Sequence, residues 1–382
     1  MKKLYVLINV FILMLLATAC WNYREVEQLT IVAGFAIDKT FDGKYLLTFE
    51  IVDLHEAKGE GKVKSVLVES EGETLMNAIR NSIGKNFPKL YFGHTTVIII
   101  CQEVAQEGVL KVIDFMVRDA EPRLNLNLFV SMDTKAGDIL KAKVLTSEIV
   151  SEELTNILDE QKNLAKALPI PVHKFIHALV EEGISGIMNS VCIEVNNEEK
   201  IAKLCGTAVF KEDKFQGFID EEETYALSFI LDEVKGGIIV VDVGSGPEEE
   251  KISLEILKSS TKIEPVYEDN KLSIKVSIDT KVVIAENGSK KNYTDKEGRE
   301  ELIKLAEEQL KKKIESIIEK IQKEFGADIF GFGNKFYKEL PKVWKEKRNE
   351  WNEIFKDLEV TIETNIKIEH TSLLSEPIKM GD

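Results

Sequence analysis

Cysteine is scarce in this sequence, and its distribution argues against a cysteine metal site. Only four cysteines occur among 382 residues, and no pair has the C-x-x-C spacing of zinc or redox motifs. Cys192 and Cys205 lie on either side of the turn-like sequence Asn196–Glu199. A hairpin through this turn would let the two side chains face each other. We expect buried free thiols, with a disulfide as the alternative.

Positive charge is in deficit, which argues against a nucleic-acid partner. The chain has 50 Lys and Arg against 66 Asp and Glu, a formal net charge of -16. Loss of an N-terminal segment that contains Lys2 and Lys3 would make the charge -18. An acidic body has no electrostatic attraction for nucleic acid or for anionic headgroups. If the protein is attached to a membrane, the attachment must therefore depend on a lipid anchor and on protein partners.

The remaining composition is that of a folded protein too large for one core. Hydrophobic residues make up 44% of the chain and charged residues 30%, which is typical of a globular protein. The 382 residues exceed what a single ordinary core organises, so we expect two or three domains.

The apolar run at the N-terminus is too short for a comfortable transmembrane helix. The segment from Leu4 to Ala19 would span roughly 24 Å as a helix, against about 30 Å of hydrocarbon in a bilayer. It follows Lys2 and Lys3 and ends in small residues, which is the arrangement of a secretory signal. Residues 1–19 are therefore predicted to be a signal peptide.

The cysteine that ends this run indicates a lipid anchor. Ala17-Thr18-Ala19-Cys20 resembles the lipobox of bacterial lipoproteins, with Ala17 where Leu is usual. In such signals the cysteine carries S-diacylglycerol and an N-acyl group after the preceding peptide is removed. Two acyl chains bury enough CH2 groups, at about 0.8 kcal/mol each, for stable attachment. The alternatives are an ordinary secretory signal with a chance cysteine, and an uncleaved anchor.

Motifs of catalysis and cofactor binding are also missing. His173 and His177 have the i, i+4 spacing of a helical zinc pair, but no glutamate follows the first histidine. His94 has no nucleophile motif nearby, so a hydrogen-bonded structural role is favoured. Gly244–Pro247 lacks the Gly-Lys-Ser/Thr of a phosphate loop, and Gly331–Gly333 is too short for a nucleotide fingerprint. We expect no enzyme activity, no metal and no cofactor.

The first half of the chain has the pattern of an α+β protein with mixed or antiparallel sheets. Residues 30–38 and 44–53 are predicted to be strands joined by the turn Asp42-Gly43. Further helices are expected at 73–83, 109–117, 147–168 and 172–181, and further strands at 63–70, 96–101, 124–130 and 187–195. The polar turn Asn196–Lys200 is the expected domain boundary. If the strands on either side of it form a hairpin, the boundary lies elsewhere.

The second half is predicted to place one long helix over an antiparallel sheet. Between Asp295 and Phe325 apolar residues recur every three or four positions, which gives a narrow stripe suited to a sheet face. Thr294-Asp295-Lys296-Glu297 has the capping-box form, and Gly326 suits the helix end. A coiled coil is the alternative. The strands are expected at 204–211, 251–257, 261–267, 272–284 and 358–369, with a shorter helix at 221–231.

A dense cluster of alternating charges follows the helix predicted at 109–117. It comprises Arg118, Asp119, Glu121 and Arg123. Solvated ion pairs are the simple interpretation, and a docking patch for a partner subunit is the functional one.

Four stretches of the sequence resemble the Ger(x)C lipoproteins, the C subunits of spore germinant receptors. The first is Cys20-Trp21-Asn22-Tyr23-Arg24-Glu25-Val26 with Gly34 and Asp38, where Asn22 replaces the aspartate of the family. The others are Tyr91-Phe92-Gly93-His94-Thr95, then Asp114 to Asp119, and finally Gly206-Thr207-Ala208-Val209-Phe210 with Lys214, Gly217, Asp328, Gly331, Pro341, Trp344 and Trp351. Their order and spacing carry the resemblance, which extends from residue 20 to about residue 370.

The resemblance implies a non-enzymatic receptor subunit built from several α+β domains. It implies a germination-protein domain at 20–198, possibly in two subdomains, and a second at 203–372. The implied partners are a membrane-spanning A subunit and a permease-like B subunit that respond to small nutrients. The Cys20 anchor would hold the protein on the outer face of the spore inner membrane, where the lipid bilayer is a further partner.

Two other classes share some of these features. A solute-binding lipoprotein of an ABC transporter has the same kind of anchor and size, but it is built from parallel βαβ units in two lobes. The hairpin-like runs of strands here favour α+β instead. A lipid-anchored hydrolase would need a nucleophile or metal motif that the sequence lacks.

Overall fold

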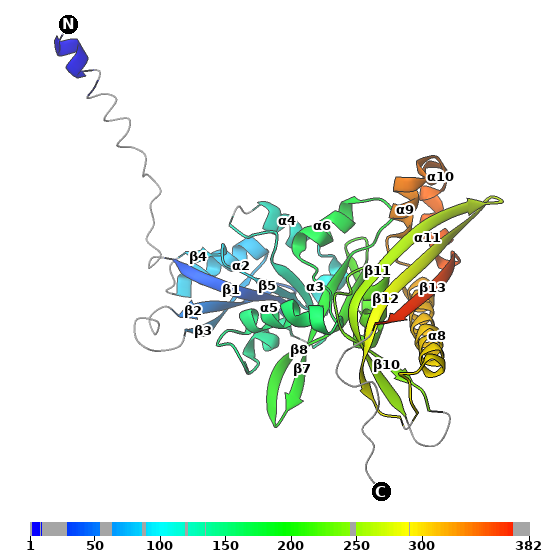
Figure 1. Ribbon diagram of the computed structural model, residues 1–382. Coiled ribbons are helices and arrows are strands. Elements are labelled where there is room, and N and C mark those ends of the chain that lie inside the picture. The colour runs from blue at the N-terminus through cyan, green and yellow to red at the C-terminus, as the bar shows by residue number, and fades with distance from the viewer. Residues whose placement is uncertain are drawn as a thin grey trace.

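The chain folds into two sheets that lie side by side, each with its own apolar core (Figure 1). The computed structural model describes residues 2–7, 9, 29–53, 63–85, 89–118, 121–133, 135–244, 250–289 and 291–369. The α+β class with packed helices is confirmed. Cys20 lies outside the described residues. Within them, no helix combines the length and the apolar character needed to cross a membrane.

The first sheet is mixed, and its middle strands are its most apolar. In the described residues its order is β3-β2-β1-β5-β6-β7-β8-β9, with β4 beside β1. β5 is Val-Ile-Ile-Ile and fully buried, as expected of a parallel strand covered on both faces. The strands are β1 (Thr30–Lys39), β2 (Tyr45–Asp53), β3 (Lys64–Gly72), β4 (Leu90–Tyr91), β5 (Val97–Ile100), β6 (Asn127–Ser131), β7 (Ile187–Asn196), β8 (Glu199–Lys211) and β9 (Lys214–Ile219).

Short amphipathic helices cover this sheet. The predicted helices at 73–83 and 109–117 are confirmed within two residues, whereas the one expected at 147–168 is shorter. The helices are α2 (Leu75–Ser82), α3 (Gln102–Glu107), α4 (Leu110–Arg118), α5 (Val150–Glu160) and α6 (Val172–Val180). Short 3-10 turns occur at Ile83–Lys85, Ala136–Lys141 and Gln161–Asn163.

Buried carboxylates hold two of these segments on the sheet. Glu50 of β2 is fully buried and accepts the backbone N–H groups of Val150 and Ser151 at 2.8 and 2.9 Å, together with the Ser151 hydroxyl at 2.5 Å. It thereby caps the first turn of α5, where four N–H groups lack helical partners. Asp38 of β1 similarly accepts the N–H groups of Ala136 and Gly137 at 2.7 and 2.8 Å.

The turn expected to separate two domains connects two strands of the same sheet. β7 and β8 pair antiparallel from Asn196 and Glu199 back to Ile187 and Val209. Asn197 and Glu198 both have positive φ, as a two-residue hairpin turn requires. The first sheet therefore continues past the boundary expected between residues 198 and 203.

This hairpin also brings two cysteines together. Cys192 and Cys205 form a disulfide, with Cα atoms 6.0 Å apart, within the range that a disulfide needs. The expectation of free thiols was therefore wrong for this pair. The strand pairing sets Cys192 opposite Lys203, two positions from Cys205. The distance of each cysteine from the turn did not fix this pairing. Cys101 is free and buried.

The second sheet has the order β10-β11-β12-β13 within the described residues. β13 pairs parallel with β12, so the sheet is not wholly antiparallel as expected. The reason is that a crossover containing the long helix α8 (Lys296–Lys320) connects them, which returns the chain in the same direction. The strands are β10 (Ile238–Asp242), β11 (Lys251–Glu268), β12 (Lys271–Asn287) and β13 (Glu359–Ile368).

The long helix lies along β13 as predicted (Figure 1). α8 (Lys296–Lys320) continues into a π-helical turn at Ile321–Phe325 and ends at Gly326, whose φ is 55°. Its N-cap is Asp295, which accepts the N–H of Gly298 at 2.8 Å, one residue later than the capping box suggested. The stripe packs on the sheet rather than in a coiled coil. The remaining helices are α7 (Glu221–Ile230), α9 (Phe332–Glu339), α10 (Pro341–Lys347) and α11 (Trp351–Lys356), with a 3-10 turn at Arg348–Glu350.

Candidate docking site

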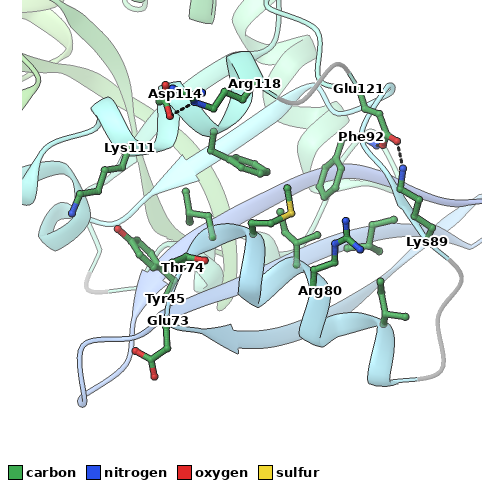
Figure 2. Close-up of a pocket in the computed structure, with 16 residues that line it drawn as sticks. Tyr45, Glu73, Thr74, Arg80, Lys89, Phe92, Lys111, Asp114, Arg118 and Glu121 are labelled. Atoms are coloured by element: carbon green, nitrogen blue, oxygen red, sulfur yellow. Dashed lines mark hydrogen bonds and ion pairs between the residues drawn. The ribbon is translucent and has the colours of Figure 1, made fainter.

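A groove of about 810 Å³ opens between α2 and α4 on the first half of the molecule (Figure 2). Apolar side chains line much of it, among them Leu75, Ile79 and the buried ring of Phe92. The side chains of Met76 on α2 and of Ile83 at its C-cap are each 42% exposed. Exposed apolar side chains gathered in a groove are typical of an interaction surface.

The rim of the groove carries more cations than carboxylates. Its basic residues are Arg80, Lys89, Lys111 and Arg118, and its acidic residues are Glu73, Asp114 and Glu121. Arg118 donates to Asp114 at 2.7 Å, and Lys89 pairs with Glu121. The local excess of positive charge contrasts with the net charge of -16 of the whole chain.

The predicted docking cluster is divided by the structure. Arg118 and Glu121 both line the groove, whereas Arg123 is exposed and is not among its lining residues. Asp119 lies outside the described residues. Arg118 and Glu121 each have an ion-pair partner, as the simple interpretation expected, but neither partner belongs to the predicted cluster.

The other half of this groove was not predicted from the sequence. Arg80 and Lys111 belong to two different helices, so they do not form a continuous charge cluster that the sequence would reveal. The available signal was helical spacing, because Met76 and Arg80 of α2 and Ile83 at its C-cap fall on one face. Only the packing of α2 beside α4 turns that face into a groove.

A second hollow, of about 610 Å³, lies where the two halves of the chain meet. The segment between α6 and β7 contacts the segment before α9, where the Ser185 N–H donates to the Asp328 carbonyl at 2.8 Å. The backbone of Gly183 lies so close to Gly333 that a Cβ at either position would overlap the other residue. Glycine is therefore required there by close approach of two backbones.

Asp328 is buried in this joint. Its carboxylate accepts the N–H groups of Phe332 at 3.1 Å and Gly333 at 2.7 Å, and the indole N–H of Trp351 at 3.2 Å. Burial raises the pKa of Asp328 to about 6, although these three hydrogen bonds favour the charged form. The Asp328 and Trp351 of the family pattern are thus joined in one buried network.

The histidines and possible metal ligands have ordinary partners. His173 Nδ1 lies 3.1 Å from the Leu124 carbonyl, and His177 Nε2 lies 3.3 Å from Glu181. His94 is exposed, and its ring packs edge-on against the ring of Tyr91, with the two ring centroids 5.9 Å apart. Over the described residues, no three His, Cys, Asp or Glu side chains are grouped as a metal site would need.

Two family models together match nearly the whole chain. Residues 22–192 match the model described as "Spore germination protein N-terminal domain", and residues 205–372 match "Spore germination B3/ GerAC like, C-terminal". The chain is 26% identical to spore germination protein B3 of Bacillus subtilis (strain 168) over 366 residues, which cover 94% of this chain and 95% of that protein. Spore germination protein A3 of the same organism is 23% identical, with 93% and 95% covered.

A solved structure shares the fold. The crystal structure of the GerBC protein aligns with a TM-score of 0.59 and 23% identity, covering 88% of this chain and 97% of that chain. The two-sheet α+β architecture is therefore shared by the two chains. The chain belongs to the GerAC-like family of spore germination proteins.

Proposed function

We propose that this protein is the lipid-anchored subunit of a nutrient germinant receptor. It takes part in spore germination by assembling with a membrane-spanning A subunit and a permease-like B subunit. The proposal is carried by the two germination-protein models, which match residues 22–192 and 205–372 in the expected order. The family is not a known enzyme family, and we propose a binding and scaffolding role without catalysis.

The proposed anchor is Cys20, on the outer face of the spore inner membrane. Its support is the N-terminal sequence, with Lys2 and Lys3, an apolar run and small residues before the cysteine. The disulfide between Cys192 and Cys205 also suits an extracytoplasmic location, because cytosolic thiols are kept reduced. The acidic surface gives the body of the protein no electrostatic attachment to anionic lipid.

The proposed domain organisation follows the resemblance, with germination-protein domains at 20–198 and 203–372. We further propose that Arg118, Asp119, Glu121 and Arg123 take part in docking on a partner subunit. Support comes from the position of Arg118 and Glu121 on the rim of the groove.

A mild-detergent pulldown of the tagged protein from dormant spore membranes tests the proposal. We expect recovery of a permease-like subunit and a second multi-pass subunit, with diacylglycerol on Cys20 by mass spectrometry. Cys20→Ala should release the protein from membranes and impair the germination response. Recovery of ABC transporter components instead would favour the solute-binding alternative, and a Cys20→Ala variant that stays membrane-bound and functional would exclude the anchor.

A further inference from the structure

We propose that the groove between α2 and α4 binds an acidic amphipathic helix of a membrane-embedded subunit of the same receptor. The inference rests on the proposed function, because it requires such a subunit beside this chain. It goes further by naming the docking surface and the chemistry of the segment that occupies it.

The shape of the groove fits a helix. Met76 and Arg80 of α2, Ile83 at its C-cap, and Lys111, Phe115 and Arg118 of α4 all line it. In both helices the spacing is i, i+4, i+7, which places the three residues on one face. Two such faces across a groove form the ridges between which a third helix packs. That helix would cover the exposed side chains of Met76 and Ile83.

The charges of the groove indicate an acidic occupant. In the described part of the chain, no carboxylate pairs with Arg80 or with Lys111 (Figure 2), whereas Lys89 and Arg118 already have partners. Burial of Arg80 and Lys111 under a neutral or basic helix would leave two cations without compensation. Glutamate or aspartate beside an apolar stripe would supply the missing partners and select the occupant against basic helices.

The position of the groove indicates a partner at the membrane. Leu90, which lines the groove, pairs with Thr30 at the start of β1. Thr30 is ten positions after Cys20, and ten residues span at most about 34 Å. An anchor at Cys20 therefore keeps the groove within reach of segments that emerge from the bilayer.

The test is co-expression of the full chain with the A and B subunits, followed by detergent extraction and affinity recovery. One variant combines Met76→Asp with Ile83→Asp, and a second combines Arg80→Glu with Lys111→Glu. The matched control combines Val195→Asp with Lys200→Glu, two exposed residues on the β7–β8 hairpin. We expect each groove variant to lower recovery of the membrane subunits at least tenfold, and the control to stay within twofold of wild type.

The contact itself is identified by a photoreactive phenylalanine analogue at Met76. We expect a crosslink to an acidic amphipathic segment of one membrane subunit. A crosslink to residues 21–28 of the same chain, or to lipid alone, overturns the inference. Equal recovery with the groove variants and wild type also overturns it, while leaving the proposed function intact. Failure of the wild-type chain to recover any membrane subunit overturns both.

Discussion

The indole N–H of Trp344 donates to the carboxylate of Glu182 at 2.5 Å, across 162 positions of the sequence. Glu182 lies between α6 and β7, whereas Trp344 belongs to α10. Arg348 also reaches Glu182 at 3.2 Å, and the amide of Asn334 donates to the Glu182 carbonyl at 3.0 Å. This one residue therefore ties the segment before β7 to three residues of the C-terminal helices.

Loss of this hydrogen bond should weaken the joint between the two halves. Trp344→Phe keeps an aromatic ring but removes the donor, and we expect it to lower the free energy of unfolding by about 1 kcal/mol. Urea denaturation of Trp344→Phe, Glu182→Gln and the double variant measures the coupling. If the two single effects simply add, the two side chains are not coupled and the assigned role is wrong.

Asp328 should make the stability of the protein depend on pH. Its pKa is raised by burial to about 6 in the folded state, above the value near 3.9 in an unfolded chain. The folded state therefore binds the proton more tightly, so this contribution is greatest below pH 4 and is lost as pH rises through 6. Between pH 7 and pH 5 it should add about 1 kcal/mol of stability.

The comparison with Asp328→Asn isolates this group from other carboxylates. The variant cannot titrate at this position, so we expect its unfolding free energy to lack the gain that the wild type shows on acidification. Urea denaturation at pH 5, 6 and 7 measures both proteins. Identical pH profiles for wild type and variant would contradict the raised pKa.

The disulfide between Cys192 and Cys205 predicts a specific thiol count. In the unfolded Cys20→Ala variant, we expect one reactive thiol, Cys101, without reductant and three after reduction. Three thiols under both conditions would show that the pair is not bonded. Replacement of both cysteines by serine should destabilise the oxidised protein by on the order of 3 kcal/mol, because the bond restricts a loop of 13 positions in the unfolded chain.

Glu50 should contribute strongly to stability, because it holds the first turn of α5 on the sheet. Each carboxylate oxygen of Glu50 accepts one of the two N–H groups, so Glu50→Gln places an NH2 donor against the N–H of either Val150 or Ser151, and we expect a loss of about 2–3 kcal/mol. Glu152→Gln, at an exposed position in the first turn of the same helix, is the matched control and should stay within about 0.5 kcal/mol of wild type. Thermal unfolding compares them, and an equal effect of both substitutions would exclude a special role for Glu50.

Much of the secondary structure is local and could be predicted from the sequence. The long helix was recognised because its stripe, its acidic N-cap region and Gly326 all lie within one segment. The turn at Asp42-Gly43 likewise needs only adjacent residues and the strands beside them. Pairing across distance could not be predicted in this way, because the parallel register of β12 and β13 depends on where α8 returns the chain.

The residues of the candidate site also differ in whether neighbouring residues or distant contacts reveal them. Arg118 and Glu121 stand in a visible charge cluster, whereas Arg80 and Lys111 reach the same groove from separate helices. Their meeting depends on how α2 and α4 pack on the first sheet. The partners of Arg118 and Glu121 also come from outside the predicted cluster. Asp114 lies one turn earlier in the same helix as Arg118, and Lys89 lies just before β4.

The sequence by itself determined the family resemblance, the α+β class, the acidic surface and the lipobox-like segment ending at Cys20, because each follows from composition or from neighbouring residues. Only the tertiary structure decided that Cys192 meets Cys205, that Glu182 meets Trp344 and that α2 and α4 enclose a groove. The two cysteines meet only because the β7–β8 hairpin forms in the right register, and the other contacts join residues far apart in the sequence. Their proximity arises from chain reversal and core packing, which no single stretch of sequence encodes.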